Sequence, residues 1–225
     1  MTELTFCNRT IGEGHLPELA LSVTDVLDTE AAVQRIGMVL ERTEGLECFG
    51  SICVRDDLRS PEAFAEVATI ASNLWDGGLI LESDNAASVV SAMPALADRR
   101  PLVCGLDPVS ASMVSSMFGC PVSVGSASLE DLLDYVGEVE SGDVVLDPRM
   151  GNMKSCLENG TDLHRLADEL PEADHPFMVK AWSGEYAVAL ASTAMLRYCS
   201  LVVADDVDRD GCEVLDRIAV SAGKR

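Results

Sequence analysis

The chain has 225 residues, 48% of them hydrophobic, with 17 glycines and 9 prolines. This size and composition predict one folded domain with a substantial core and exclude a chain that is mainly disordered. The 38 acidic residues outnumber the 16 basic ones, so the net charge is −22 at pH 7. This charge argues against a broad basic face that would bind nucleic acid or an anionic membrane.

Eight short apolar segments recur along the chain, and each is followed by a segment with helical periodicity. The predicted strands are residues 19–24, 49–54, 79–81, 101–105, 121–124, 144–146, 177–179 and 201–204. Capping residues mark several helix starts, because short polar side chains satisfy the first free N–H groups of a helix. The predicted helices begin at or near Asp28 or Thr29, Ser60-Pro61, Asn85 or Ala86, Pro108, Ser128, Asn152, Ser183-Gly184-Glu185 and Arg209.

The ends of the helices are predicted in the same way. Glycines close the second helix at Gly77-Gly78 and the fourth at Gly119, as is common at helix C-termini. The third helix is expected to reach Asp98, the irregular sixth helix to reach Leu170 and the last helix to reach Ala222.

The strands are nearly continuous apolar runs, which is typical of parallel strands covered by helices. Eight consecutive strand–helix units with right-handed crossovers predict an α/β protein of one domain, the (β/α)8 TIM barrel. We place the barrel at residues 18–225, after an N-terminal segment of residues 1–17 whose role the sequence does not reveal. An open doubly wound sheet is the alternative, but the chain lacks G-x-G-x-x-G after its first strand and G-x-x-x-x-G-K-[ST] throughout.

Polar residues follow almost every predicted strand, at the end of the barrel where such folds place their chemistry. The candidates for binding a cofactor are Glu82, Asp84, Asn85, Asp107, Asp147, Arg149 and Lys180. Carboxylates near an arginine and a lysine match the amide and amino edge of a heterocycle, and they could also hold a metal. Helix capping alone is enough to explain Asp25, Asp56, Asp107 and Asp205. It explains Glu82, Asp147 and Lys180 less well, because these lie at or next to strand ends.

Histidine and cysteine patterns argue against a metal centre. The three histidines, His15, His164 and His175, show neither H-x-H nor H-E-x-x-H spacing, and no Ser-His-Asp triad is expected. None of the eight cysteines forms a C-x2-C pair, so we predict no metal, no iron–sulfur cluster and no disulfide. Eight thiols favour a strongly reducing cell such as that of an anaerobe. The sequence assigns no catalytic residue.

Targeting signals are not evident. No apolar run reaches the roughly 20 residues of a membrane-spanning helix. The first residues also lack the basic and then apolar pattern of a secretion signal. We therefore expect a cytoplasmic protein that does not enter the membrane.

Five stretches carry a family resemblance: residues 55–85, 98–103, 119–121, 144–148 and 191–198. They resemble the barrel domain of the corrinoid iron–sulfur protein of the acetyl-CoA synthase/CO dehydrogenase complex, and above all its large (gamma) subunit. The resemblance runs in order over about residues 5–206. It implies a barrel that supports or caps a methylated corrinoid and is similar in fold to pterin-binding methyltransferases.

That large subunit also carries a cysteine-rich segment for a four-iron cluster and a C-terminal cobamide domain. This chain has neither feature, so the resemblance implies a barrel that acts with a partner and does not carry the methyl group alone. Pterin-binding relatives use an Asp-Pro-Gly motif after strand six, where this chain has Asp147-Pro148-Arg149-Met150-Gly151, with Arg149 in place of the first glycine. Asp84-Asn85 is a second partial match, and Lys180 matches a lysine that those relatives use near the ring.

Three functions remain open at this point. The first is a standalone barrel in one-carbon (methyl) metabolism that positions or shields a cobamide or a methyl-pterin. Its partners would be a corrinoid protein or subunits like those of acetyl-CoA synthase/CO dehydrogenase, and it needs no catalytic group, because transfer relies on the nucleophilic cobalt. The second is a methyltransferase that uses a corrinoid or a tetrahydropterin, with Asp147, Asn85 and Lys180 at the pterin. The third is a non-catalytic assembly subunit.

Overall fold

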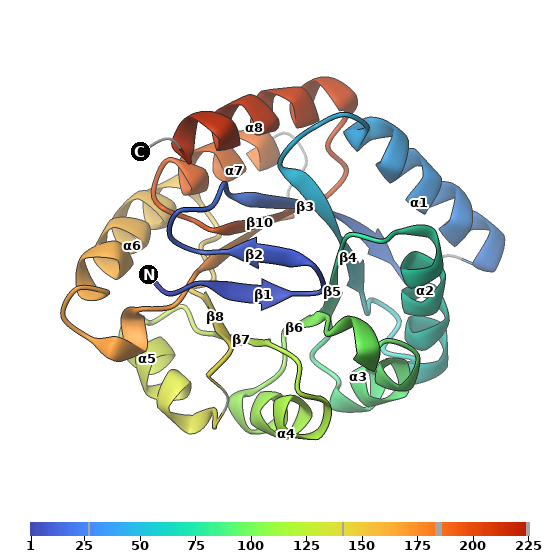
Figure 1. Cartoon of the computed structure of the whole chain (residues 1–225), viewed down its shortest axis with the longest axis horizontal. Coiled ribbons are helices and arrows are strands. Elements are labelled where there is room, and N and C mark those ends of the chain that lie inside the picture. Colours follow the sequence, from blue (N-terminus) through green and yellow to red (C-terminus); the bar gives the residue numbers. More distant parts are fainter. Residues whose placement is uncertain (27, 141, 183–185, 224–225) are drawn as a thin grey trace.

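A ring of parallel strands surrounded by helices forms the body of the molecule (Figure 1). The computed structural model describes residues 1–26, 28–140, 142–182 and 186–223. The strands of the ring are β3 (Glu18–Thr24), β4 (Phe49–Arg55), β5 (Gly78–Glu82), β6 (Leu102–Cys104), β7 (Val122–Gly125), β8 (Val144–Asp147), β9 (Met178–Ala181) and β10 (Leu201–Ala204). The helices are α1 (Thr29–Thr43), α2 (Pro61–Leu74), α3 (Ala86–Ala92), α4 (Pro108–Phe118), α5 (Leu129–Glu138), α6 (Met153–Leu166), α7 (Ala187–Met195) and α8 (Arg209–Ala222).

Pairing between neighbouring strands closes the ring. The strand order is β8-β7-β6-β5-β4-β3-β10-β9, and all of these pairs are parallel. A parallel bridge between Leu146 and Phe177 joins β8 to the chain that enters β9. The predicted TIM barrel is therefore confirmed, and the alternative of an open sheet is excluded.

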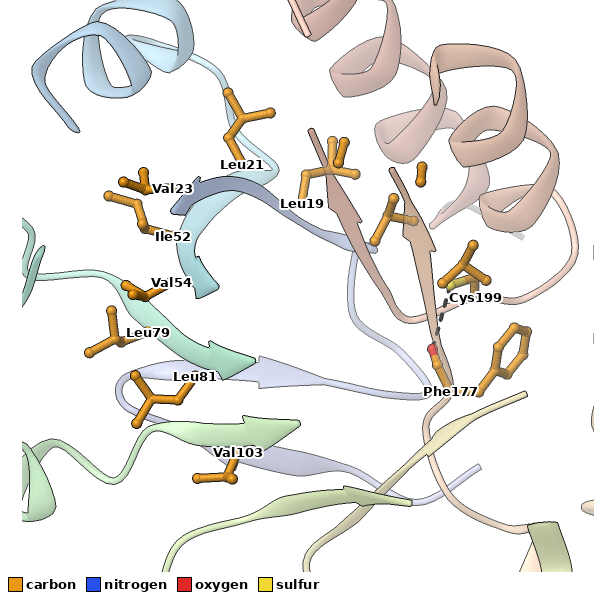
Figure 2. Packing of buried hydrophobic residues seen from close by; sticks show 14 of the residues in the cluster. Leu19, Leu21, Val23, Ile52, Val54, Leu79, Leu81, Val103, Phe177 and Cys199 are labelled. Carbon is orange, nitrogen blue, oxygen red and sulfur yellow. Dashed lines mark hydrogen bonds between the residues drawn. The ribbon is translucent and has the colours of Figure 1, made fainter. Parts of the chain in front are cut away.

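Alternation along each strand divides its side chains between two cores. One set points outward to the helices, and Figure 2 shows residues such as Leu19, Ile52 and Leu81 in this layer. In the same layer the Cys199 thiol donates to the Phe177 carbonyl oxygen at 3.5 Å. The other set, with Ile80 among it, fills the inside of the ring. Both faces of the sheet are thus buried, as its apolar strands predict.

Caps define the helix starts as the sequence predicts. The side chains of Asp28, Ser60, Asn85, Asp107 and Ser128 each accept a hydrogen bond from a backbone N–H in the first turn. Gly119 ends α4 with a left-handed φ of 64°, a conformation that glycine adopts without steric cost.

Three helices end earlier than predicted. α2 stops at Leu74 with Trp75 as its C-cap, and Gly78 opens β5 instead of closing the helix. Prolines account for the other two. The third helix stops at Ala92 and continues as a short 3-10 turn, Met93–Ala95, because Pro94 has no N–H to donate. α6 stops at Leu166, and Leu170 is extended, as is usual for a residue before proline. The predicted start of the seventh helix at residues 183–185 lies outside the described residues.

A short hairpin closes one end of the barrel. β1 (Leu4–Phe6) and β2 (Arg9–Ile11) pair antiparallel and lie across the middle of the ring in Figure 1. Their buried side chains join the inner core. Arg9 forms an ion pair of 2.6 Å with the buried Glu18 at the start of β3. The hairpin therefore seals the end of the barrel at which the strands begin.

The opposite end, where the strands finish, remains available for a ligand.

Within the described part of the chain, no helix combines the length and apolar character that a membrane span requires.

Candidate functional site

Three charged side chains meet inside the barrel where its strands end. Glu82 closes β5, Asp147 closes β8 and Lys180 lies in β9. Each follows an inner-core residue of its own strand by two positions, and these are Ile80, Val145 and Met178. Because side chains two apart share one face of a strand, the three charged groups point toward a common centre.

Lys180 lies between the two carboxylates. Its Nζ donates to Glu82 Oε1 at 2.7 Å and lies 2.8 Å from Asp147 Oδ2. All three side chains are largely buried, with 13% of Lys180 and 20% of Glu82 exposed. Burial lowers the pKa of Lys180, but the coulombic attraction of Asp147 and Glu82 more than offsets this, and the pKa is raised. Lys180 is therefore an ammonium held by two carboxylates.

The three groups leave one acceptor unused. Asp147 Oδ1 accepts the Arg149 backbone N–H at 3.0 Å. Glu82 Oε2 is buried and has no hydrogen-bond partner among the described residues. A buried acceptor without a donor costs free energy.

A cavity of about 300 Å³ lies directly over these groups. Ser123, Arg149 and Trp182 line it together with the three charged residues. Two glycines keep it open beside the carboxylates. A Cβ at Gly105, whose φ is +94°, would lie 3.2 Å from Glu82 Oε1, and one at Gly125 would lie 3.3 Å from the Asp147 carbonyl oxygen.

A second cavity, of about 380 Å³, adjoins the first and shares Glu82, Gly105 and Trp182 with it. Arg55, Asp56, Arg59 and Asp84 are among its other lining residues. Arg59 forms an ion pair with Asp84. The mouth of the barrel thus has two connected lobes, and the second is the more polar of the two.

The predicted candidates fall into three groups. Glu82, Asp147, Arg149 and Lys180 line the first cavity, and Asp84 lines the second. Asn85 and Asp107 line neither of the two cavities; they cap α3 and α4. The Asp107 carboxylate accepts hydrogen bonds from the Ser110 and Val109 N–H groups, and the bonds to Ser110 in particular hold its pKa below the ordinary value.

Arg149 lies where the family resemblance predicts a glycine. Its φ is +47°, a left-handed conformation that favours glycine. The backbone at this position thus has a glycine-like conformation although the residue differs. The Arg149 side chain is exposed and extends past Gly125 at the rim of the cavity.

Sequence reasoning missed two residues of the mouth, Arg55 and Trp182. Arg55 ends β4 and lines the second cavity, and Trp182 lines both cavities. Period-two alternation gives the missing signal for Trp182, which follows Lys180 by two positions, directly after the end of β9, and packs against the inner core.

The site can recognise hydrogen-bond donors. Two carboxylates and one ammonium carry a net negative charge, and both carboxylates border the cavity. Such a site suits a flat heterocycle with amino and amide N–H groups along one edge. Among the described residues, no group of three or more histidines, cysteines or acidic residues is arranged to hold a metal ion.

Comparisons with known proteins agree with this fold. No protein-family model matches the chain. It is 28% identical over 164 residues to the corrinoid/iron-sulfur protein large subunit of Moorella thermoacetica, a match that covers 68% of this chain and 36% of that protein. The chain therefore spans little more than a third of the length of this relative.

Solved structures of dihydropteroate synthases (DHPS) share the barrel over nearly the whole chain. The Coxiella burnetii enzyme in complex with pteroic acid has a TM-score of 0.75 at 10% identity, with 99% of each chain covered. The Yersinia pestis DHPS with a pterine-sulfa conjugate has a TM-score of 0.73 at 15% identity, with 100% of each chain covered. At these identities the likeness shows a common fold.

Proposed function

We propose that the mouth of this barrel binds a pterin-type heterocycle and that the protein acts in one-carbon (methyl) metabolism together with a cobamide-carrying protein. The observation that carries the proposal is the pair of carboxylates, Glu82 and Asp147, that Lys180 holds by two ion pairs at the wall of a cavity of about 300 Å³.

A pterin fits the donors and acceptors of this cavity. Its aminopyrimidinone edge presents N–H donors, which Glu82 and Asp147 would accept, and its carbonyl oxygen and ring nitrogens are acceptors for the Lys180 ammonium. Hydrogen bonds to charged groups are the stronger kind, at about 1.5–3 kcal/mol each. Gly105 and Gly125 leave room for the ring beside the carboxylates.

The known proteins that resemble this chain support the same ligand class. Two DHPS structures with this fold contain a pteroic acid and a pterine-sulfa conjugate, and the relative from Moorella is a corrinoid protein subunit. A methyl-pterin supplies a methyl group on a ring nitrogen, and a reduced cobamide is a nucleophile for it. The role of this chain would be to bind and orient the pterin and to keep the Lys180 proton close to it.

A second candidate function is the shielding of a partner's cobamide without binding a pterin. The similarity to the corrinoid protein subunit favours it. In that case the open end of the barrel would cover the corrinoid, and Glu82 and Asp147 would serve only to hold Lys180.

Calorimetry with pterin and with 5-methyltetrahydropterin tests the proposal. We expect the unmodified protein to bind both ligands. Glu82→Gln should weaken binding at least tenfold, because it removes one charged acceptor at a cost of about 1.5–3 kcal/mol. Asp147→Ala should abolish measurable binding, because it also frees Lys180 from one of its two partners.

The matched control is Asp107→Asn. This carboxylate also follows a strand but caps α4 away from both lobes, and asparagine is an equally good cap. The affinity of Asp107→Asn for pterin should equal that of the unmodified protein. Absence of pterin binding, combined with a spectral change of hydroxocobalamin on mixing with the protein, would replace the first function with the second. If neither ligand binds, the role of an assembly subunit would be the explanation left.

A further inference from the structure

Trp182 separates the two lobes of the mouth. It follows β9 directly and lines both cavities. Its ring is partly buried and packs against the inner core of the barrel. The indole is therefore supported by the inner core, and it contributes to the walls of both lobes.

One side of the indole is already occupied. The Arg55 guanidinium carbon lies over the Trp182 ring, 4.7 Å from its centroid, which is a favourable cation–π distance. Arg55 lines the second cavity and is not among the residues that line the first. The residue that stacks on the indole therefore belongs to the wall of the second cavity and not to that of the first.

Arg55 is itself held by two carboxylates. Its guanidinium forms ion pairs of 2.9 Å with Asp57 and 3.1 Å with Asp205. Asp205 also accepts the Ser22 hydroxyl at 2.6 Å. These contacts join the ends of β4, β3 and the chain after β10, so the arginine that stacks on Trp182 has a fixed position.

We propose that Trp182 is the platform on which the flat ring of the ligand lies, and that Arg55 is the positioning residue that holds this platform. The inference rests on the proposed function and deepens it. It assigns to the first cavity a flat heteroaromatic ligand with its plane against the indole and its donor edge toward Glu82. Specificity would then come from two surfaces, a stacking face and an acceptor edge.

Stacking on tryptophan has a measurable effect on affinity. Removal of an aromatic platform beneath a nucleic acid base weakens binding roughly 5- to 150-fold, and a bicyclic heterocycle is of similar size. We expect Trp182→Ala to weaken pterin binding by a factor in that range. Trp182→Phe should retain most of the affinity, because phenylalanine keeps an aromatic face.

Fluorescence can report on the platform directly, because the chain has only two tryptophans. Trp75 caps the end of α2 near Gly77, at the hairpin end of the barrel. In the Trp75→Phe variant, Trp182 is the only tryptophan that emits, and pterin should protect it from quenching by acrylamide. The control is Trp182→Phe, in which the quenching of Trp75 should not change when pterin is added.

Arg55→Met tests the positioning role without ligand. In the Trp75→Phe background this change should shift the Trp182 emission to longer wavelength, because the indole loses its cover and meets water. It should also weaken pterin binding by less than Trp182→Ala does. An unchanged emission spectrum would contradict the role of Arg55.

The outcomes separate the two proposals. If pterin binds and Glu82→Gln weakens it, but Trp182→Ala binds equally well and Trp182 is not protected, the platform is wrong and the proposed function stands. If the unmodified protein does not bind pterin, both proposals fall. Circular dichroism of Trp182→Ala and Trp182→Phe checks that a loss of affinity does not reflect unfolding.

Discussion

Asp25, which is buried, and Asp56, which is half-buried, are neighbouring carboxyl groups directly after β3 and β4. Asp25 is 1% exposed, and its Oδ1 accepts the Asp57 and Leu58 N–H groups at 2.8 and 3.0 Å. Asp56 Oδ2 accepts the Ser83 hydroxyl at 2.6 Å. The other oxygens, Asp25 Oδ2 and Asp56 Oδ1, are buried and have no partner among the described residues. Two such groups side by side resist being ionised together.

The pKa of Asp25 reflects this environment. Burial raises the pKa, the Leu58 and Asp57 N–H groups oppose the rise, and the neighbouring Asp56 adds to it. Since the pKa is higher in the folded state, the stability that the proton contributes is present at acid pH and is lost as pH rises through the folded pKa. Ionisation of Asp25 as the pH rises therefore destabilises the fold.

Asp25→Asn should stabilise the protein at pH 8. The amide oxygen of the new side chain can still accept the two backbone N–H groups, and its NH2 group can donate to Asp56 Oδ1. We expect a gain of about 1 kcal/mol in the free energy of unfolding, measured by urea denaturation. The gain should be smaller at pH 3 than at pH 8, because the raised pKa of Asp25 favours its protonated form at acid pH and the proton removes its repulsion with Asp56. An equal gain at both pH values would show that the gain does not come from removing the charge of Asp25.

Residue chemistry alone predicted part of the site. Glu82, Asp147 and Lys180 were separable from caps because they lie within strands or at their last residues, where a side chain faces the barrel interior. Asn85 and Asp107 have equally suitable side chains but begin helices. Which polar residue faces inward depends on the residue at which each strand ends. The sequence does not predict that end to within one residue.

Among the elements, the β1–β2 hairpin is the one that the sequence did not predict. Its strands have three residues each, too few for a period-two pattern to stand out. Its burial depends on inner-core side chains that come from all around the ring. Helix ends were predictable where a cap or glycine marks them, as at Gly119, and were misplaced where the prediction ignored Pro94 and Pro171.

The hairpin should contribute stability and not ligand affinity. Phe6 is fully buried in the inner core, so Phe6→Ala should cost about 3–5 kcal/mol in unfolding free energy. Pterin affinity at the far end of the barrel should be unchanged while the protein remains folded.

The neighbouring Thr5 supplies the matched control for that experiment. Its side chain is exposed and shares a hydrogen bond of 3.0 Å with Thr10. Thr5→Ala should change stability by less than about 0.5 kcal/mol, as is usual for surface positions. Urea denaturation measures both variants. A small effect of Phe6→Ala would mean that the hairpin does not seal the barrel in solution.

At the level of the whole molecule, the architecture was the most predictable feature. Eight repeats of one strand and one helix restate the same pattern, so an error at one boundary does not change the fold. Closure depends on the bridge between Leu146 and Phe177 and the neighbouring bond from the Leu146 N–H to the Pro176 carbonyl. Handedness and strand number predict that closure even though no local sequence signal marks it.

The net charge of −22 is also a property of the whole molecule, and it predicts a response to salt. With 38 acidic and 16 basic residues, repulsion between like charges outweighs attraction and opposes the compact state. Sodium chloride shortens the range of this repulsion, from about 30 Å at 0.01 M to about 3 Å at 1 M. The midpoint of thermal unfolding should therefore rise with salt, as measured by circular dichroism.

Helix α5 offers a variant that isolates this effect. Glu130, Asp134 and Glu138 are exposed and spaced four residues apart, so each like-charged pair is unfavourable. Asp134 and Glu138 also lie toward the C-terminus of the helix, where the dipole disfavours negative charge. The double variant Asp134→Asn/Glu138→Gln should be more stable than the unmodified protein in low salt, and its midpoint should rise less with salt. A midpoint that falls as salt is added would mean that attractive ion pairs, and not repulsion, dominate the surface.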